Sequence, residues 1–337
     1  MLLQVLNHFG MEEVLYGLFC GHVLRMLLFL LHGASMNNEL DLCTLIQDFG
    51  SEEKCRIYLE KLRWPKGIYC PSCGSDKISR IAARNQFDCD ACRYQFSATA
   101  GTIFHDTHLP LWKWFLATYL LCESRKGMSA NQLSRMLKTT YKTAWYLSHR
   151  IRAAMLETAP KKLGGTVEID ETYIGGKPRK WRDRPEKQVV IGIRQRNGDL
   201  RLIHAEDAKS NTVREIIKAN VGSHVEVIVT DESAIYPWAL DRMQKNLHRT
   251  INHSKHYAHG DVHTNTVESA FSLLKRGIVG TWHKVSAKHL PAYLDEMCFR
   301  FNNRKNPYLF RDTMLKLIGS PNLEYKELTA QQAEPAA

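Results

Sequence analysis

The chain has 337 residues, enough for two or three small domains, and its hydrophobic fraction of 44% excludes a wholly disordered protein. Its net charge of +11 is concentrated between residues 61 and 163, where 17 Lys and Arg residues stand against 6 Asp and Glu residues, while the remaining 29 basic and 29 acidic residues cancel. Composition leaves two interpretations of this basic segment open, a contact with nucleic acid or a solvated basic surface.

Residues 1–35 differ from the rest of the chain. The apolar run Val23–Leu31 is interrupted by Arg25 and is too short to span a bilayer, so no membrane partner is expected. A signal peptide fits this segment poorly, because no charged leader precedes a clean apolar stretch with a cleavage site. We hypothesise that translation begins at Met36 and that residues 1–35 are a non-native extension. An intact mass that included them, measured on protein expressed from the native start region, would contradict this hypothesis.

Residues 36–100 are predicted to form a short helix, at Ser51–Arg63, followed by a zinc ribbon. Its cysteines follow the pattern C-x2-C-x15-C-x2-C and are Cys70, Cys73, Cys89 and Cys92. Each pair can turn both sulfurs toward one tetrahedral ion, whereas a redox pair or a coincidence of thiols is the alternative. Because four ligands leave no open position, we predict a structural Zn²⁺, with short strands from 77–87 and 94–96.

Residues 101–160 are predicted to be helical. The apolar and aromatic run at 109–124 indicates a buried helix. Ser129–Leu137 and Tyr141–Met155 then follow as two helices around a tight turn, the second one basic, which is typical of a helix-turn-helix that binds DNA. Any small helical hairpin has a similar pattern, so a helical hairpin without a role in DNA binding is the alternative.

The faces of these two helices can be assigned from their periodicity. The residues expected to face inward are Leu133, Met136, Leu137, Ala144, Leu147 and Ile151. The residues expected to face solvent or DNA phosphate are Lys142, His149, Arg150 and Arg152. Among the latter, Lys142, Arg150 and Arg152 are the predicted DNA contacts.

Residues 161–310 alternate strands with helices. Strands are predicted at 166–170, 188–194, 200–204 and 225–231, with a helix at 211–219. Asn197-Gly198 is a hairpin turn signal between the second and third strands. Three strands, a helix, another strand and further helices is the order of an α/β ribonuclease H-like catalytic domain with a mixed sheet. Residues 311–337 are predicted to be a C-terminal tail.

Two aspartates close or interrupt predicted strands, Asp170 and Asp231. A carboxylate in such a place is costly unless it meets a cation or a hydrogen-bond donor, although both residues could merely cap turns. Each is followed by a glutamate, Glu171 or Glu232. Because strand neighbours point to opposite faces, the Asp and the Glu of a pair are not expected to share one role.

A third acid follows Asp231 after 36 intervening residues, Glu268, on a helix with an apolar stripe. Lys275 lies two turns further along nearly the same helix face. Magnesium and manganese prefer oxygen ligands, so Asp170, Asp231 and Glu268 with DNA phosphate oxygens would form a two-metal site. One ion would activate the attacking oxygen and the other would stabilise the leaving oxygen.

The combined motifs resemble the DDE-type bacterial insertion-sequence transposases that carry an N-terminal zinc ribbon, relatives of the Merlin elements. The matching residues are Arg63-Trp-Pro, Cys70-Pro-Ser-Cys73-Gly, Asp170-Glu-Thr-Tyr-Ile-Gly-Gly-Lys177, Thr230-Asp231 and His263-Thr-Asn-Thr-Val-Glu268 to Lys275-Arg276-Gly277. The resemblance covers about Phe49 to Asn306. It implies that Asp170, Asp231 and Glu268 are catalytic and that Lys275, with Arg276, contacts DNA.

Two alternatives concern single positions. Some branches of this group carry Asn as the third member, and Asn265 lies one turn before Glu268. Four histidines, His253, His256, His259 and His263, could suggest a second zinc site, but Gly260 and the polar context favour phosphate contacts or ordinary loop residues.

The function that the resemblance implies is hydrolysis of DNA at the ends of the insertion sequence, here called the element. The freed 3′-hydroxyls would then attack target DNA in line, without a covalent protein intermediate. The expected partners are double-stranded DNA, as terminal inverted repeats and target, and further copies of the chain, in the bacterial cytoplasm at the nucleoid. Two other hypotheses are a ribonuclease H-like nuclease or junction resolvase and a captured transposase that only binds DNA as a regulator. Terminal inverted repeats beside the gene would separate the transposase from both.

Overall fold

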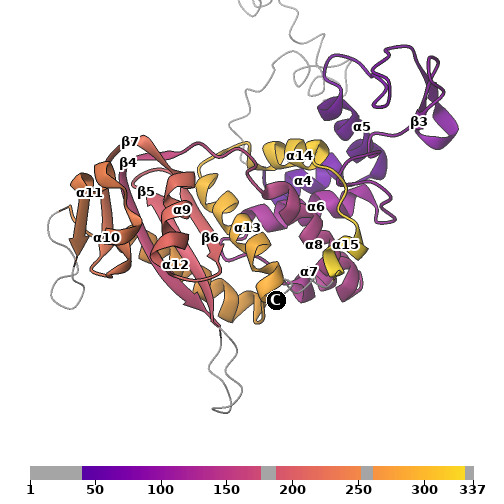
Figure 1. Ribbon diagram of the computed structural model, residues 1–337. Coiled ribbons are helices and arrows are strands. Elements are labelled where there is room, and N and C mark those ends of the chain that lie inside the picture. The colour runs from indigo at the N-terminus through magenta and orange to yellow at the C-terminus, as the bar shows by residue number, and fades with distance from the viewer. Residues whose placement is uncertain (1–39, 176–186, 252–260, 331–337) are drawn as a thin grey trace, which may run out of the picture. The chain divides into compact units, whose positions relative to one another are not determined.

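The computed structural model describes residues 40–175, 187–251 and 261–330 (Figure 1). The elements from Leu42 onward belong to one structural unit. The hypothesis about residues 1–35 lies outside the described residues. Across the described ranges, no helix is both long and apolar enough to cross a membrane.

The first described elements are two helices and a small sheet. Helix α4 spans Leu42–Phe49 and α5 spans Glu52–Arg63, where the Ser51 hydroxyl accepts a hydrogen bond from the Lys54 amide and so caps α5. An antiparallel sheet of three strands follows, in the order β1-β2-β3, formed by Ile78–Ile81, Gln86–Cys89 and Gln95–Phe96. The predicted short helix and ribbon strands are therefore confirmed.

A small aromatic core supports this ribbon. The Trp64 ring packs edge-on against Phe87 and Phe96, with centroids 5.5 and 5.8 Å apart. The Arg63 guanidinium donates to the Ser97 and Ala98 carbonyls at 3.3 and 2.8 Å. Because Arg63 ends α5, these bonds join the ribbon to the preceding helix.

Three helices follow the ribbon, α6 (Leu111–Glu123), α7 (Ala130–Leu137) and α8 (Tyr141–Met155). The hydroxyls of Ser129 and Thr140 cap α7 and α8, each accepting a backbone amide three residues later. Lys138 adopts a left-handed conformation (φ 48°) between them, which makes the turn tight. The predicted two-helix hairpin is thus present with its expected ends.

The inward faces of α7 and α8 agree with the prediction except at one position. Leu133, Leu137, Ala144, Leu147 and Ile151 are buried. Met136 is 49% exposed, so its predicted inward position is wrong. Successive residues are about 100° apart around a helix, so Met136 points away from the direction of its buried neighbour Leu137. Helix α7 contacts α6 and α8.

The largest sheet has five strands in the order β6-β5-β4-β7-β8. Their bounds are Leu163–Ile174 (β4), Gln188–Gln195 (β5), Leu200–Ala205 (β6), Val221–Asp231 (β7) and His248–Ile251 (β8). β4, β5 and β6 pair antiparallel, and β4, β7 and β8 pair parallel. The mixed ribonuclease H-like sheet is therefore confirmed, with β8 added at the edge.

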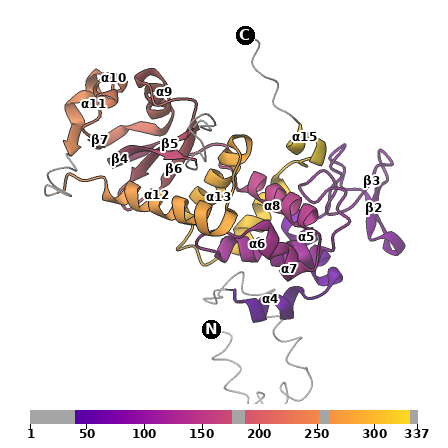
Figure 2. The ribbon, with the colours of Figure 1, turned by 90° about the horizontal axis from the view of Figure 1, so that it is seen from below.

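Helices cover both faces of this sheet (Figure 2). On one face, Ile169, Ile191 and Ile228 share an apolar cluster with residues of α9 (Ser210–Asn220) and α10 (Ile235–Ala239). On the other, Val190 and Leu202 share a second cluster with α12 and α13, which span Asn265–Gly277 and Leu290–Asn302. The shorter helical segments are α11 (Arg242–Leu247), η1 (Ala82–Arg84), η2 (Ile278–Trp282) and η3 (Ala287–His289).

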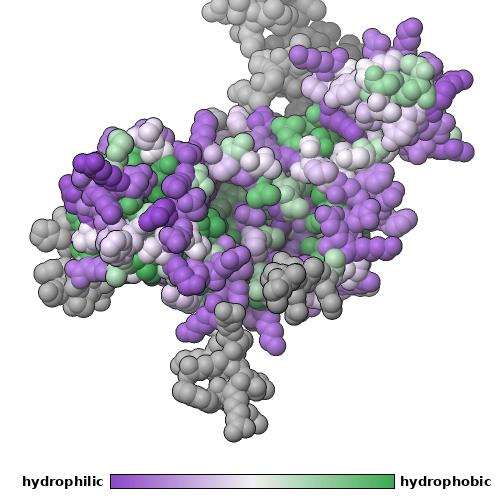
Figure 3. Space-filling view, in the orientation of Figure 1, coloured by the Kyte–Doolittle hydropathy of each residue, from purple (hydrophilic) through white to green (hydrophobic). Residues whose placement is uncertain are grey.

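The predicted boundary between residues 310 and 311 falls inside α14 (Leu309–Gly319). Met314 and Leu317 are fully buried, and the helix packs against α5, α6 and α8. Residues 311–319 are consequently part of the helical core, and α15 (Tyr325–Thr329) follows them. The face in Figure 3 is largely hydrophilic, with hydrophobic residues visible in separate small groups.

Candidate active site

The register of the central strands brings the two aspartates together. β4 and β7 run parallel with Glu168 opposite Val229. Two residues further along both strands, Asp170 lies beside Asp231. Paired residues of neighbouring strands point to the same face, and such strands lie about 4.8 Å apart.

Helix α12 covers that face and carries the third acid. Val267, Phe271 and Leu274 form its buried stripe, as predicted. Glu268 lies in the first turn, where its Oε1 accepts a 2.8 Å hydrogen bond from the Thr264 hydroxyl. Asn265 is the exposed first residue of the helix.

The electrostatics of Asp170 report a cluster of carboxylates. Its pKa is raised to about 7, first by burial and then by the neighbouring charges of Glu171, Asp231 and Glu268. A cation placed among these carboxylates would relieve both costs, and three carboxylates are the oxygen donors that Mg²⁺ and Mn²⁺ prefer. The donor chemistry of the three acids therefore suits a divalent cation, although among the described residues the tight cluster of ligand atoms is that of the four cysteines and not of these carboxylates.

The acid that follows Asp170 faces the opposite side of the sheet, as strand alternation predicts. The Tyr236 hydroxyl, on α10, donates a hydrogen bond to the Glu171 carboxylate. Burial raises the pKa of Glu171. Glu171 thus belongs to the α10 side of the sheet, while Asp170 lies on the α12 side.

The four predicted zinc ligands converge. Within the described part of the chain, Cys70, Cys73, Cys89 and Cys92 are the group whose ligand atoms all lie within 4.8 Å of one another. The sulfurs of Cys70 and Cys92, and those of Cys73 and Cys89, are 3.6 Å apart. A tetrahedral ion with 2.3 Å Zn–S bonds requires about 3.8 Å between sulfurs, close to these two distances, so the four cysteines fit a zinc site.

Three of the five predicted DNA contacts are exposed. Lys275 and Arg276 lie in the last turn of α12, with Lys275 two turns from Glu268. Lys142 is exposed near the start of α8, and its ammonium lies 4.5 Å from the centroid of the Tyr325 ring. These three cations are available to phosphate.

The predicted exposure of Arg150 and Arg152 is wrong, because both side chains are buried within the helical core. The Arg152 Nε donates to Glu296 Oε2 at 2.5 Å. Arg150 donates to the His105 carbonyl and to Asn322 Oδ1 at 2.9 and 2.8 Å. The partners come from distant parts of the chain, with a carboxylate for Arg152 and neutral oxygen acceptors for Arg150, so neither guanidinium faces a phosphate.

His149 is also buried, contrary to the predicted solvent-facing position. Its ring lies among Trp145, His289 and Tyr293, with centroids 4.5 to 5.6 Å away. Burial, and then the charge of Arg152, lower its pKa to about 2. The side chain is therefore a neutral member of an aromatic cluster.

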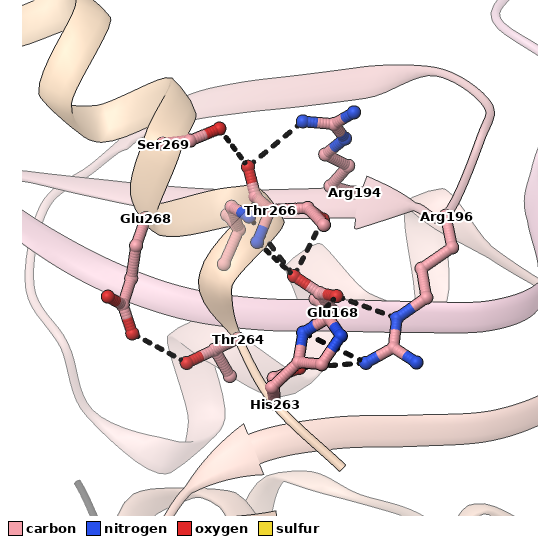
Figure 4. A network of polar contacts seen from close by, with 9 residues as sticks. Glu168, Arg194, Arg196, His263, Thr264, Thr266, Glu268 and Ser269 are labelled. Atoms are coloured by element: carbon pink, nitrogen blue, oxygen red, sulfur yellow. Dashed lines mark hydrogen bonds and ion pairs between the residues drawn. The ribbon is translucent and has the colours of Figure 1, made fainter. Parts of the chain in front are cut away.

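One buried acid beside the site was not predicted, Glu168 on β4 (Figure 4). It ion-pairs with Arg196, lies 3.3 Å from His263 Nδ1, and accepts hydrogen bonds from the start of α12. The sequence does contain a signal for it. An acid two residues before Asp170 in a β-branched strand must share the face of Asp170, and there it needs partners.

Two sequence predictions fall partly outside the described residues. Lys177 and the histidines His253, His256 and His259 are not among them. His263 is described, and its Nδ1 lies 3.3 Å from Glu168 Oε1. This histidine contacts a carboxylate that also binds an arginine.

Two family models match the chain, a transposase zinc-ribbon domain at residues 50–95 and an ISXO2-like transposase domain at residues 162–302. A protein from Halobacterium salinarum, described as an uncharacterized protein in transposable element ISH50, is 30% identical over 271 residues, covering 74% of this chain and 90% of that protein. A Mos1 strand transfer complex shares 11% identity at a TM-score of 0.28, covering 61% of this chain and 75% of that chain. A pre-cleavage Mos1 transpososome shares 13% identity at a TM-score of 0.22, covering 59% and 76%. The matched ranges contain the four cysteines and the three acids described above.

Proposed function

The chain belongs to the family of insertion-sequence transposases that combine a transposase zinc ribbon with an ISXO2-like transposase domain, and from this premise we propose how it acts on DNA. The enzyme hydrolyses the phosphodiester bond at each end of its element. The freed 3′-hydroxyls then attack target DNA in line. No covalent bond between protein and DNA forms in either step.

Asp170, Asp231 and Glu268 are the proposed catalytic residues. The observation that carries this assignment is the parallel register of β4 and β7, which sets the two aspartates side by side under the helix that bears Glu268. Glu268 is favoured over Asn265 because its charge acts on Asp170, whereas Asn265 is exposed at the helix start. When bound, two Mg²⁺ or Mn²⁺ ions would supply activation of the attacking oxygen and stabilisation of the leaving oxygen.

The chain's own residues would orient the DNA. Lys275 and Arg276 continue the helix of Glu268 away from the acids, so they would hold the phosphates next to the scissile bond. Lys142 would contact phosphate from α8. These charge-based contacts predict an affinity that falls steeply with salt concentration.

The four-cysteine site is proposed to hold a structural zinc ion, because its four sulfurs complete a tetrahedral set. The ribbon and the α7–α8 hairpin are proposed to bind the terminal inverted repeats. Since two element ends must be joined to one target, we propose that at least two copies of the chain assemble on DNA. The reaction is proposed to take place in the cytoplasm, on the DNA of the nucleoid.

The test is cleavage of end-labelled element DNA by the purified protein with Mg²⁺ or Mn²⁺, compared with Asp231→Ala. The matched control is Glu226→Ala, which removes an exposed carboxylate from the same strand. We expect cutting at the element boundary by the wild type and the control, and a loss of about 1000-fold or more in Asp231→Ala.

Each other outcome favours a different function. Binding without cutting, with both metals and paired ends supplied, would favour a captured DNA-binding regulator. Cutting that ignores the end sequence would favour a nuclease. Full cutting by Asp231→Ala would exclude the proposed site.

A further inference from the structure

We propose that Glu168 is a positioning residue, which fixes the start of α12 to the strand of Asp170 and thereby controls the position of Glu268 relative to the aspartates. This inference rests on the proposed function of the three acids. It adds a residue that does not itself touch metal or DNA.

The first observation is how completely the Glu168 carboxylate is used by α12. Its side chain is fully buried. Oε2 accepts hydrogen bonds from the Thr266 amide at 2.9 Å, the Thr266 hydroxyl at 2.7 Å and the Val267 amide at 3.1 Å (Figure 4). These amides belong to the first turn of α12, where a helix has no backbone acceptors of its own. Glu168 therefore caps α12 from another element.

The second observation is that the helix's own cap residue has a different partner. Thr264 occupies the N-cap position, but its side chain makes no capping hydrogen bond. Its hydroxyl instead donates to Glu268 Oε1 at 2.8 Å. The capping role is thus transferred to Glu168, and the residue that would ordinarily cap the helix holds the proposed catalytic carboxylate (Figure 4).

The third observation is that Glu168 is itself held in place. Its Oε1 accepts from Arg196 Nε at 2.7 Å and lies 3.3 Å from His263 Nδ1. Arg196 also donates to the His263 carbonyl at 3.0 Å, just before α12. Arg194, on the neighbouring strand, donates to the Thr266 carbonyl at 2.9 Å. The approach to α12 and its first turn are therefore tied to β4 and β5 from several sides.

The fourth observation is the geometric link to the acids. Glu168 and Asp170 are two residues apart on β4 and so point to the same face of the sheet. Val267 and Glu268 are consecutive on α12. A shift at the Glu168–Val267 hydrogen bond therefore moves Glu268 relative to Asp170 with little intervening structure to absorb it. Residues that orient metal ligands in this way typically change metal affinity or activity by about 10- to 100-fold when altered.

The experiment compares the full-length variants Glu168→Gln and Glu296→Gln. Glu296 is the matched control because it is also a fully buried carboxylate paired with arginines, but it faces α8 instead of the start of α12. Mn²⁺ binding is measured by electron paramagnetic resonance without DNA, cleavage is measured across Mn²⁺ concentrations, and thermal unfolding is measured for both variants.

We expect Glu168→Gln to weaken Mn²⁺ binding about 10- to 100-fold while the KM for DNA stays within about twofold. Raising the Mn²⁺ concentration should restore most of its kcat. Glu296→Gln should lower the melting temperature at least as much but leave Mn²⁺ affinity within about twofold of wild type. Thr266→Val, which removes one of the three donors to Oε2, should give a smaller effect in the same direction and covers the case in which Glu168→Gln does not fold.

Equal losses of Mn²⁺ affinity in Glu168→Gln and Glu296→Gln would overturn the proposal, since the effect would then be general destabilisation. Wild-type Mn²⁺ binding in a folded Glu168→Gln or Thr266→Val would overturn it as well. Asp231→Ala separates this inference from the proposed function. If Asp231→Ala keeps Mn²⁺ binding and cleavage, the three-acid site itself is wrong. If Asp231→Ala loses both while Glu168→Gln binds Mn²⁺ and cleaves like the wild type, only the positioning role is refuted.

Discussion

The four-cysteine site and the three-carboxylate site are built in opposite ways. The cysteines lie within 23 residues of sequence, and local turns bring their sulfurs together. The carboxylates come from two strands and a helix separated by nearly 100 residues. Their positions depend on sheet register and on contacts such as those of Glu168.

This difference indicates which parts of each site carry its geometry. In the cysteine site the ligands and the nearby turns are sufficient to arrange the four sulfurs, so the rest of the chain contributes little to the geometry of that site. In the carboxylate site the ligands are necessary, but residues that touch no metal decide whether they meet. Substitutions should therefore separate the two sites, and the following predictions test that separation.

The largest expected effect is in the ribbon. Cys89→Ala removes a buried zinc ligand, and sites of this type contribute about 10–16 kcal/mol of binding free energy to folding. We expect loss of bound zinc and of protease protection over the ribbon strands, with Mn²⁺ affinity at the carboxylates unchanged. Zinc content and limited proteolysis measure this, with the exposed Cys43→Ala as control. A parallel loss of Mn²⁺ binding would mean that the two sites are not independent.

The next effect concerns the helices between the sites. Arg152→Met leaves the buried Glu296 without one of its two arginine partners and should lower the free energy of unfolding by about 3–5 kcal/mol. The dependence of DNA affinity on salt should not change, because Arg152 is buried. Lys142→Ala is the opposite case, with little loss of stability and a slope of log affinity against log salt reduced by about 0.9. A reduced slope in Arg152→Met at constant stability would restore the role in DNA contact predicted from the sequence.

A smaller effect is expected where α12 approaches β5. Gly192 pairs with Asp170 across the sheet, and a Cβ there would lie 2.6 Å from the Phe271 ring and 2.8 Å from Val267. Gly192→Ala should cost about 1–3 kcal/mol by overpacking, and the displaced α12 should reduce cleavage by up to about 100-fold. Zinc content should be unchanged. Gly319→Ala, where the added Cβ meets no neighbour within 4 Å, is the control, and equal cleavage by the two variants would contradict the prediction.

The smallest effect is a dependence of stability on pH. His149 is neutral in the folded protein because burial lowers its pKa to about 2, while in the unfolded chain it takes up a proton below about pH 6.5. Its contribution to stability is therefore complete above pH 6.5 and is lost as the pH falls, with a slope of at most about 1.4 kcal/mol per pH unit. His149→Phe should flatten the fall in unfolding free energy between pH 6.5 and 5. Identical pH profiles for the two proteins would exclude this role.

The sequence predicted most of the elements, because their signals are local. Ser129 and Thr140 accept the capping hydrogen bonds that define the starts of α7 and α8. Asn197 adopts the left-handed conformation expected of the hairpin turn between β5 and β6. The cysteine spacing likewise predicted a cluster that the fold brings together.

The contacts that connect distant elements could not be predicted in the same way. The second helix of the hairpin is basic by composition, yet the partner of Arg152 lies 144 residues later in α13. No periodicity within α8 distinguishes an arginine that meets such a partner from one that faces solvent. The contacts of Glu168 were missed for the same reason, since its Arg196 donor lies 28 residues away and its donors on α12 begin 98 residues away.

The pairing of α8 with the end of the chain has a consequence for damaged copies of the gene. Arg152 takes its counter-charge from Glu296, and Arg150 takes one of its two acceptors from Asn322, so α8 is complete only when the C-terminal segment is present. A stop codon just before α13 would leave the ribbon, the helices and the sheet in place but remove Glu296 and Asn322, so two guanidiniums of α8 would lose these partners. We expect such truncated products to be degraded instead of persisting as repressors that occupy the element ends, so a nonsense mutation should silence its own copy without restraining intact ones.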